Sequence, residues 1–294
     1  MTQAAHHPHP QASNAQSANA QPAHRPEFGL IIVGDEILSG KRADKHMPKL
    51  IELLSARGLS LDWADYVGDS PERITRTLAR AFESNSVVFS CGGIGATPDD
   101  HTRQCAAKAL GVDLSLHPEA AALIRERMQD VAKEQGVPYD PERDDNVHRL
   151  NMGVFPVGAH IIPNPYNKIA GFSCQGPVGA VHFVPGFPVM AWPMMEWVLD
   201  THYAHLFQQG AWVEQSIIIY GSMEATITPL METLERDFEG IKVFSLPSVD
   251  HPEHGRHIEL GVKGAPEKVA PAYAAMLAGL QPFGFKFGPE LVRK

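Results

Sequence analysis

The chain has 294 residues, of which 44% are hydrophobic, enough to fill one large domain or two smaller ones. Its formal net charge of -9, with histidine neutral, excludes the broadly basic chain typical of nucleic-acid-binding proteins, so a nucleic-acid partner is not expected. Cys91, Cys105 and Cys174 are odd in number and too widely spaced for a metal knuckle, which indicates a reducing, cytoplasmic compartment.

The first 26 residues are rich in Ala, Gln, His and Pro, and this composition predicts a disordered low-complexity tail. The segment lacks the basic start and the apolar core of a secretory signal. His6, His7 and His9 are candidate ligands for a transition metal, but a solvated tail is the simpler interpretation. No apolar run approaches the roughly 18 residues of a spanning helix, so a membrane partner is not expected.

Strand and helix signals alternate between Phe28 and Gly111. The runs "FGLIIVG", "LSLDWADYVG" and "SVVFSCGG" are short, apolar and ended by glycine, as buried strands are. The segments after them have helical spacing, and one begins with Ser70 as an N-cap and Pro71 at the first helical position. This order predicts an α/β fold with a mainly parallel sheet that helices cover on both faces.

Two more strands, "AHIIPN" and "AVHFVPG", precede a helix in which Pro193 starts or kinks a segment. Its "MAWPMMEW" stretch is either core or a subunit interface. From Trp212 the order changes to β-α-β-β-α, which predicts a small α+β domain. The expected division is a tail over residues 1–26, a first domain over 27–208 and a second over 209–294.

Three predicted strands end in a glycine with an acid in the following loop: "VGDEILSG", "VGDS" and "CGGIGATPDD". Ligands of open parallel sheets bind beyond the carboxyl ends of the strands, so the three loops predict one site. Glycines let the backbone approach an anion closely. N-capping explains Asp69, Asp99 and Asp100 as well as function does, whereas the Asp35-Glu36 pair has no obvious capping role.

In the third loop, "CGGIGATPDD", capping predicts where the following helix begins. With Thr97 as the N-cap, Pro98 is the first helical residue and Asp100 lies in the first turn, where the N–H groups of the helix face the ligand. Other phosphate and nucleophile motifs are absent. There is no G-x-x-x-x-G-K-[ST], no G-x-S-x-G, and Pro98 replaces the third glycine of a dinucleotide fingerprint.

The motifs "GDEILSG", "VGDSPERI", "GGIGATPDDHT", "IIPNPYNKIAGF" and "VHFVPGFPVM" resemble, in this order, the molybdopterin-binding domain family of MoaB/Mog type. More narrowly they resemble the amino-terminal domain of CinA-type proteins, over roughly Phe28 to His205. The resemblance implies a three-layer α/β sandwich followed by a small KH-like βαββα domain. The carboxy-terminal amidohydrolase domain of full-length relatives does not fit in the remaining residues, so nicotinamide-nucleotide deamidation is not expected.

The resemblance also implies a pterin pocket at the glycine-rich motif. Asp69 and Asp100 match acids that adenylyltransferase relatives use to activate molybdopterin with ATP and magnesium, and Asp99 and Asp100 are the implied metal ligands. The expected ligand is molybdopterin or a nucleotide, and because relatives are dimers or trimers, a homo-oligomer is expected. The implied ligand-binding residues are Gly34, Asp35, Glu36, Ser39, Gly40, Gly92, Gly93, Ile94, Gly95, Thr97, Asp99, Asn164, Gly171, Pro185 and Gly186.

The chain departs from the family pattern at three places. Ala96 stands where proline is usual, His46 where asparagine is usual, and Asn167-Lys168 where two small residues are usual. Lys168 either contacts a phosphate or, as we favour, is solvated. Three functions stay open: binding or adenylylation of molybdopterin, CinA-type hydrolysis of ADP-ribose with Asp35, Glu36, Asp99 or Asp100 on a metal, and a non-catalytic binding or assembly module.

Several other features have simple structural interpretations. The stretch "HPEHGRH", with His251, His254 and His257, reads as an exposed turn rather than a metal site, and His202 and His205 read as surface residues. The segment 261–264 has the G-x-x-G form of a KH loop but reads as a plain turn, and Cys91 as a buried strand residue.

Overall fold

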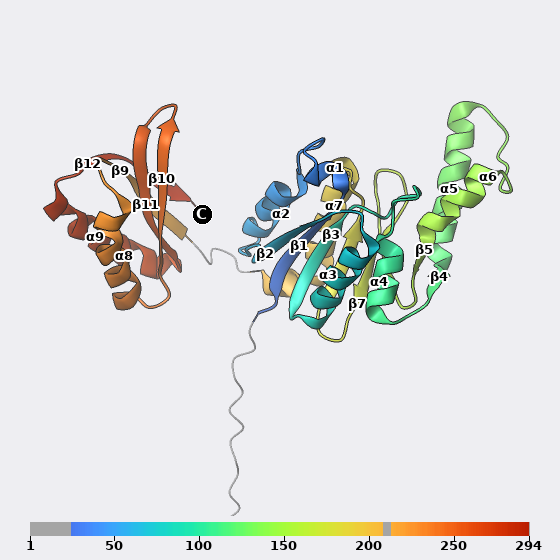
Figure 1. The fold of residues 1–294 in the computed structure, drawn as a ribbon, viewed down its shortest axis with the longest axis horizontal. Helices are drawn as coiled ribbons and strands as arrows, with labels where there is room; N and C mark the ends of the chain where they lie inside the picture. The colour runs from blue at the N-terminus through green and yellow to red at the C-terminus, as the bar shows by residue number, and fades with distance from the viewer. Residues whose placement is uncertain (1–24, 208–212, 294) are drawn as a thin grey trace, which may run out of the picture.

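The computed structural model describes residues 25–207 and 213–293 (Figure 1). The expected tail up to residue 24 and the expected boundary at residues 208–209 lie outside the described residues. In the first unit, strands and helices alternate as β1 Glu27–Val33, α1 Asp35–Leu38, α2 His46–Ser55, β2 Trp63–Val67, α3 Pro71–Glu83, β3 Ser86–Cys91, α4 Thr102–Leu110, β4 Leu114–Leu116, α5 Pro118–Gln135, α6 Asp144–Leu150, β5 Val154–Pro156, β6 His160–Ile162, β7 Gly171–Gln175, β8 Ala180–Val184 and α7 Pro188–His202.

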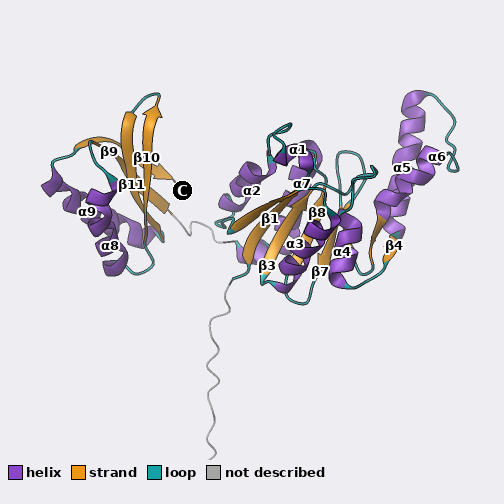
Figure 2. Cartoon of the chain, in the orientation of Figure 1, coloured by secondary structure: helices purple, strands orange, loops and turns teal. Residues whose placement is uncertain are grey.

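Six of these strands form one sheet in the order β2-β1-β3-β8-β7-β6. The neighbours β2, β1, β3 and β8 are parallel, and β7 is antiparallel to both β8 and β6. The prediction of a mainly parallel sheet is therefore confirmed. The short strands β4 and β5 pair separately beside the helices α5 and α6, which extend from the rest of the unit (Figure 2).

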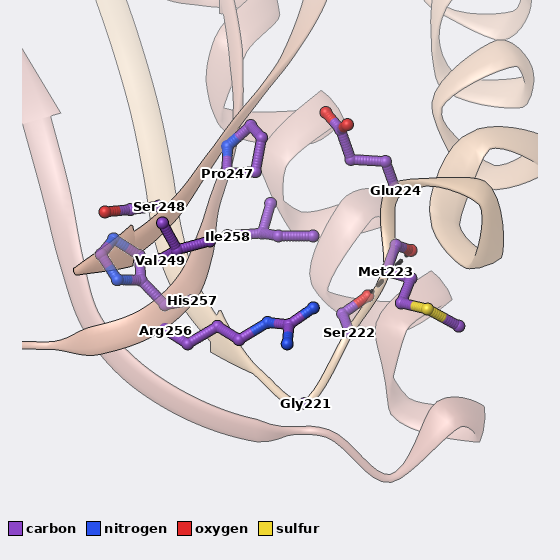
Figure 3. Close-up of a pocket in the computed structure, with 10 residues that line it drawn as sticks. All are labelled: Gly221, Ser222, Met223, Glu224, Pro247, Ser248, Val249, Arg256, His257 and Ile258. Atoms are coloured by element: carbon purple, nitrogen blue, oxygen red, sulfur yellow. Dashed lines mark hydrogen bonds between the residues drawn. The ribbon is translucent and has the colours of Figure 1, made fainter. Parts of the chain in front are cut away.

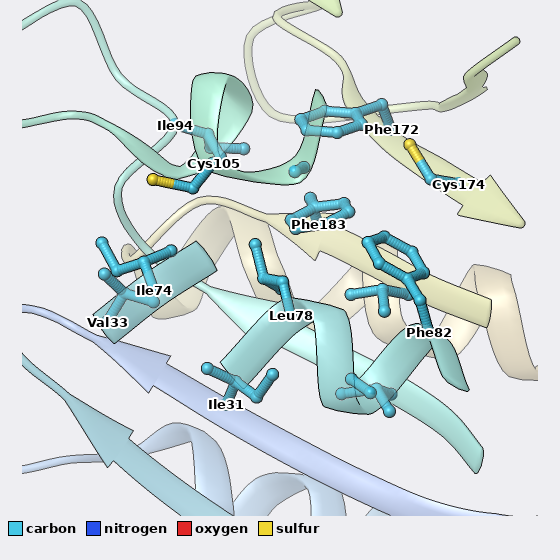
Figure 4. Close-up of a cluster of buried hydrophobic side chains, with 14 of the residues drawn as sticks. Ile31, Val33, Ile74, Leu78, Phe82, Ile94, Cys105, Phe172, Cys174 and Phe183 are labelled. Carbon is cyan, nitrogen blue, oxygen red and sulfur yellow. The ribbon is translucent and has the colours of Figure 1, made fainter. Parts of the chain in front are cut away.

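Helices cover both faces of this sheet, as predicted. Because alternate residues of a strand point to opposite faces, Ile31 of β1 joins one buried cluster while Leu30 and Ile32 join the other. Figure 4 shows the first cluster, in which Leu78 and Phe82 of α3 pack against the sheet. In the second, α2 and α7 cover the sheet with the side chains Leu50, Leu54, Met194, Met195, Val198 and Leu199. Met194 and Met195 of the "MAWPMMEW" stretch are thus core residues, Met190 is partly buried, and α7 continues through Pro193.

The second unit contains β9 Val213–Tyr220, α8 Glu224–Asp237, β10 Lys242–His251, β11 Gly255–Gly264, α9 Pro266–Leu280 and β12 Lys286–Arg293. Its sheet is antiparallel, in the order β10-β11-β9-β12. The expected small α+β unit is present, but β12 extends the KH-like βαββα order to βαββαβ, with the first and third strands central as in a split βαβ arrangement. The helices α8 and α9 share a buried core with β9 and β11.

Two local predictions in this unit are wrong. The G-x-x-G segment is no turn, because Gly261 and Gly264 are paired residues of β11. His257 is buried on the same strand, and only the turn between His251 and Gly255 is loop-like. His202 and His205 are exposed and Cys91 is buried, as expected. No helix in the described part of the chain is long and apolar enough to span a membrane.

Candidate functional site

The predicted loops do meet at one edge of the first sheet, where β1, β2, β3 and β8 end. Backbone hydrogen bonds join them in pairs: the Gly34 N–H donates to the Val67 carbonyl at 3.0 Å, and the Gly92 N–H donates to the Val184 carbonyl at 3.1 Å. A fourth loop, after β8, therefore borders the site, with Pro185 and Gly186 directly after the strand. A methyl group added to Gly186 would lie 3.5 Å from the Gly92 Cα, so these two loops are in contact.

The helix after the glycine loop does not begin at Pro98. It begins at Thr102, and the predicted capping role of Thr97 and Asp100 is corrected accordingly. Instead, the Asp100 carboxylate accepts hydrogen bonds from the N–H (2.8 Å) and the hydroxyl (2.5 Å) of Thr97, and the Asp100 N–H donates to the Thr97 carbonyl (3.1 Å). These bonds close a turn ahead of the helix. One Asp100 oxygen is thus occupied by the loop itself.

Two glycines of this loop are required by close packing. Gly92 has φ 100°, and a Cβ there would lie 2.4 Å from the Val33 carbonyl oxygen. Gly93 has φ 68°, and a Cβ there would lie 2.2 Å from the Thr102 hydroxyl oxygen. L side chains rarely adopt such backbone conformations, and in both cases space is missing as well. The glycines let β3 turn sharply beside β1 and α4.

Four consecutive carbonyls of the loop are held by α4, through two residues that the sequence reasoning missed. Buried Thr102 donates from its hydroxyl to the Gly92 carbonyl (3.2 Å) and from its N–H to the Gly93 carbonyl (3.0 Å). Buried Arg103 donates to the carbonyl of Ile94, and at 2.7 Å to that of Gly95. Burial lowers the pKa of Arg103, and the Asp100 charge opposes this shift. The only sign of this role in the sequence is that α4 begins with two polar residues, Thr102 and Arg103.

This arrangement orients the N–H groups of residues 93–96. In a trans peptide, the carbonyl of one residue and the N–H of the next point in opposite directions. Because the carbonyls of residues 92–95 face the donors of α4, the following N–H groups face the other way. Within the described residues, these four N–H groups donate no hydrogen bond. Several N–H groups that face one side and have no acceptor in the protein form a typical anion-binding cradle.

The acids of the first two loops lie side by side. The Asp35 N–H donates to Asp69 Oδ2 at 2.9 Å, and the Asp69 N–H donates to Asp35 Oδ1 at 3.2 Å. Partial burial raises the pKa of Asp69, and the charges of Asp35, Glu36 and Asp99 raise it further, against the lowering effect of the Asp35 hydrogen bond. The structure therefore brings these four acids close enough to interact.

The carboxylates of the site do not enclose a metal ion by themselves, but they can contribute to a magnesium site that phosphate and water complete. Among the described residues, no group of three or more His, Cys, Asp or Glu side chains is arranged to enclose a metal ion. Magnesium, however, is commonly held by one or two carboxylates, with phosphate and water as the other ligands. Asp35, Asp69 and Asp100 each keep one carboxylate oxygen without a protein donor within the described ranges. Asp35 and Asp69, which lie side by side, fit magnesium only when a phosphate completes the site.

A cavity of about 260 Å³ lies next to these loops, between Glu36, the segment 42–46 and the segment 186–188. Buried His46 shapes it: Nε2 lies 3.1 Å from the Gly186 carbonyl and, since a carbonyl only accepts, carries the hydrogen. Burial lowers the pKa of His46, which favours the neutral ring. The Arg42 guanidinium lies 5.9 Å from the centre of the exposed Phe187 ring at the cavity. No sequence motif indicated this cavity, although His46 is one of the residues at which the chain departs from the family pattern.

The loop between β6 and β7 is held by its own side chains. Buried Asn164 donates to Asn167 Oδ1 (2.8 Å) and to the Ile169 carbonyl (2.9 Å), and accepts from the Tyr166 N–H (3.0 Å). A Cβ on Gly171 would lie 2.4 Å from the Phe183 carbonyl oxygen. Asn164 and Gly171, predicted to bind ligand, thus have structural roles here.

Lys168 is ion-paired and not the purely solvated lysine that we favoured from the sequence. Its ammonium group lies 2.6 Å from the Glu126 carboxylate and 2.7 Å from that of Asp130, both on α5. It adopts φ 64°, the only positive φ of a non-glycine residue in the described part of the chain. Elsewhere in the predicted site, Ser39 and Gly40 are exposed at the end of α1.

Comparison with known proteins identifies the family. Residues 29–205 match the family model described as "Probable molybdopterin binding domain". A protein of Thermoplasma volcanium is 29% identical over 74% of this chain and 79% of its own length. A CinA-like protein of Citrifermentans bemidjiense is 28% identical over 69% of this chain but only 46% of its own length.

One solved structure, a CinA protein of unknown function from Thermoplasma acidophilum, is 26% identical. It aligns with a TM-score of 0.49 over 59% of this chain and 97% of its own. Since the family model covers more than half of the chain and CinA-like proteins are among its relatives, the chain belongs to the molybdopterin-binding domain family of MoaB/Mog type, in its CinA-type group.

Proposed function

We propose that this protein binds a pterin or nucleotide through its phosphate, with molybdopterin as the first candidate. The observation that carries the proposal is the set of N–H groups of residues 93–96, which face away from Thr102 and Arg103 and have no acceptor within the described chain. A phosphate has the acceptor oxygens that these donors lack. The membership in the molybdopterin-binding family supports the pterin as the ligand body.

The neighbouring cavity suits the ring system of such a ligand. It borders Gly186, whose loop contacts Gly92 at the start of the glycine loop, and the ring system of a ligand with its phosphate on residues 93–96 would extend toward it. Arg42 and Phe187 offer planar surfaces for stacking on a heterocycle. The neutral His46 holds the Gly186 carbonyl and thereby the shape of this wall.

The carboxylates near the glycine loop would also allow metal-assisted adenylylation. When magnesium is bound, it neutralises phosphate charge. Asp35 and Asp69 lie side by side, and the charge of Asp99 acts on Asp69, so these carboxylates, with Asp100 next in the loop, are the ones that would hold such an ion. Asp69 and Asp100 would then position the phosphate of ATP for adenylylation of the pterin.

Isothermal titration calorimetry tests the binding proposal. We expect molybdopterin, ATP or ADP-ribose to bind, and the phosphate-free counterparts, such as adenosine, to bind at least tenfold more weakly. Arg103→Met removes the donors that orient the loop and should weaken binding at least tenfold, whereas Arg76→Met, on the exposed side of α3, should leave it unchanged. If none of the three phosphate ligands binds, or if adenosine binds equally well, the proposal is wrong.

The second candidate is metal-dependent hydrolysis of the pyrophosphate of ADP-ribose. The observation that favours it is the cluster of Asp35, Glu36, Asp69 and Asp99 beside the phosphate cradle, since several carboxylates are more than binding alone requires. Release of AMP and ribose phosphate with magnesium, abolished in Asp69→Asn, would support it. Binding without turnover of ADP-ribose or of ATP with molybdopterin would instead favour the non-catalytic binding module.

A further inference from the structure

The second unit has a cavity of its own, far in sequence from the site described above. It is an open pocket of about 470 Å³ between the segment 221–223, the first residue of α8 and the paired strands β10 and β11 (Figure 3). Pockets for small molecules commonly measure about 300 to 1,000 Å³, so the space suits a compact ligand. Nothing in the family assignment concerns this cavity, since the family match ends at residue 205.

The register of the sheet places an arginine at the open end of the core. Ile258 pairs with Pro247, and Ile258 and Leu260 belong to the buried cluster beneath the helices. Alternate residues of a strand share a face, so Arg256, two residues before Ile258, lies on the same helix-covered side. The pairing of β10 with β11 shifts between Ser248 and His251, but the extra residue belongs to β10, so the alternation along β11 is not interrupted. Arg256 thus extends the core face as a cation.

No anionic group of the described chain satisfies this arginine. Arg256 is exposed and forms no ion pair with any described residue. The one acid that lines the cavity, Glu224, accepts a hydrogen bond from the Ser245 hydroxyl at 2.9 Å. Figure 3 shows the Glu224 carboxylate directed away from the Arg256 guanidinium, which lies near Ser222. A guanidinium is well suited to bind a carboxylate or phosphate with two parallel hydrogen bonds.

The other walls are apolar. Ile258 is only 4% exposed and closes the floor, while Met223 is 66% exposed and Val249 74% exposed at the mouth. Pro247 completes this surface from β10, an edge strand that tolerates a residue without an N–H. Methionine adapts its shape to different ligands, so this wall suits apolar groups of more than one shape. The cavity therefore combines one cationic group with an apolar surface.

We propose that this cavity binds a small organic anion, a carboxylate or phosphate ester that carries an apolar group. The anionic group lies on the Arg256 guanidinium and beside the Ser222 hydroxyl. The apolar group lies on Met223, Pro247 and Ile258. This site is independent of the phosphate cradle in the first unit, and either site can exist without the other.

The test uses the full chain and four probes: 4-phenylbutyrate, phenyl phosphate, the neutral 4-phenylbutanamide, and inorganic phosphate. We expect the two organic anions to shift the backbone amide resonances of residues 221–224 and 256–258. We expect the amide and inorganic phosphate to bind at least tenfold more weakly. A stronger response to 4-phenylbutyrate assigns a carboxylate ligand, and a stronger response to phenyl phosphate assigns a phosphate ester.

Matched variants test the role of the arginine. Arg256→Gln should weaken the organic anions at least tenfold, and Lys263→Gln, an equal charge change at an exposed residue of the same strand, should not. Ser222→Glu, which places a carboxylate beside Arg256, should also weaken them. The proposal is overturned if no probe shifts these resonances, if the amide binds as well as the acid, if inorganic phosphate binds as tightly as the organic anions, or if Arg256→Gln has no more effect than Lys263→Gln.

Discussion

The loop after β3 and the loop between β6 and β7 both lie near the edge where β8 ends, but different interactions hold them. The carbonyls of residues 92–95 are fixed from outside by Thr102 and Arg103, and the N–H groups of residues 93–96 have no acceptor within the described chain. In residues 164–169 the side chain of Asn164 satisfies the loop from within. The first loop thus keeps four consecutive N–H groups for a ligand, whereas the second uses the N–H groups of Tyr166, Lys168 and Ile169 to close on itself, although the sequence suggested ligand residues in both.

The largest expected effect separates crowding from backbone strain in the glycine loop. Gly92→Ala places a Cβ 2.4 Å from the Val33 carbonyl oxygen at φ 100°, and we expect it to lower the free energy of unfolding by about 3 kcal/mol. Gly158→Ala is the matched control, because Gly158 has φ 88° and nothing within 4 Å of the added atom. It should cost only about 1 kcal/mol in urea denaturation. Equal losses in both variants would show that the glycine loop is not tightly packed.

The second loop should depend on one side chain. Asn164→Ala removes three hydrogen bonds and leaves the Tyr166 N–H and the Ile169 carbonyl without their partner, so we expect a loss of about 2 kcal/mol in the same measurement. The exposed Asn151→Ala should change stability by less than about 0.5 kcal/mol. Asn164→Ala should leave phosphate affinity within about twofold, since the cradle lies in the other loop. A tenfold loss of affinity at unchanged fold would place Asn164 on the ligand instead.

A smaller effect on stability separates the ion pairs of Lys168 from the cost of its positive φ. Lys168→Ala removes the ion pairs to α5 but keeps the unfavourable positive φ, whereas Lys168→Gly removes both. Glycine should therefore be the more stable of the two variants by about 1 kcal/mol. Urea denaturation of both variants measures this difference directly. If alanine is as stable as glycine, the left-handed backbone at Lys168 costs nothing.

The smallest expected effect is a difference in pH dependence between the two units. The pKa of Asp69 is raised above its ordinary 3.8, so the native state favours the protonated form, and its stability falls as pH rises through the window that begins near 3.8. The pKa of Glu259 is lowered from 4.5 by the hydrogen bond from Arg293. Its contribution is present above pH 4.5 and is lost as pH falls through the native pKa.

Denaturation midpoints of Asp69→Asn and Glu259→Gln between pH 3 and 7 measure both effects. Relative to the unchanged protein, Asp69→Asn should gain stability as pH rises across this range, and Glu259→Gln should lose stability. Slopes of the same sign would mean that one of the two pKa shifts is assigned in the wrong direction.

The sequence predicts five of the six strands of the first sheet, because most of them are short apolar runs ended by glycine, but it does not predict β7. The prediction from sequence is wrong where a polar residue could either cap a helix or close a turn. Thr97 and Asp100 have the spacing of a helix cap, yet their mutual hydrogen bonds close a turn, and the helix starts five residues after Thr97. The strand β12 was missed because its sequence, "KFGPELVR", contains glycine and proline and lacks alternation.

The candidate site was predicted in part. The convergence of Asp35, Asp69 and the glycine loop follows from topology, since strand ends of a parallel sheet share an edge. The roles of Thr102 and Arg103 do not follow from spacing, because they depend on which way four peptide planes are turned. The structural role of Asn164 likewise appears only when the loop closes on itself.

The most direct test of the central claim is to observe the cradle while a ligand binds. In a titration followed by amide resonances, the account predicts that ADP-ribose, ATP or molybdopterin shifts the N–H protons of Gly93, Ile94, Gly95 and Ala96 downfield, as new hydrogen bonds to phosphate do. Adenosine should leave them in place. Tight binding of a phosphate ligand with these four resonances unchanged, and with shifts concentrated at residues 164–169 instead, would contradict the account.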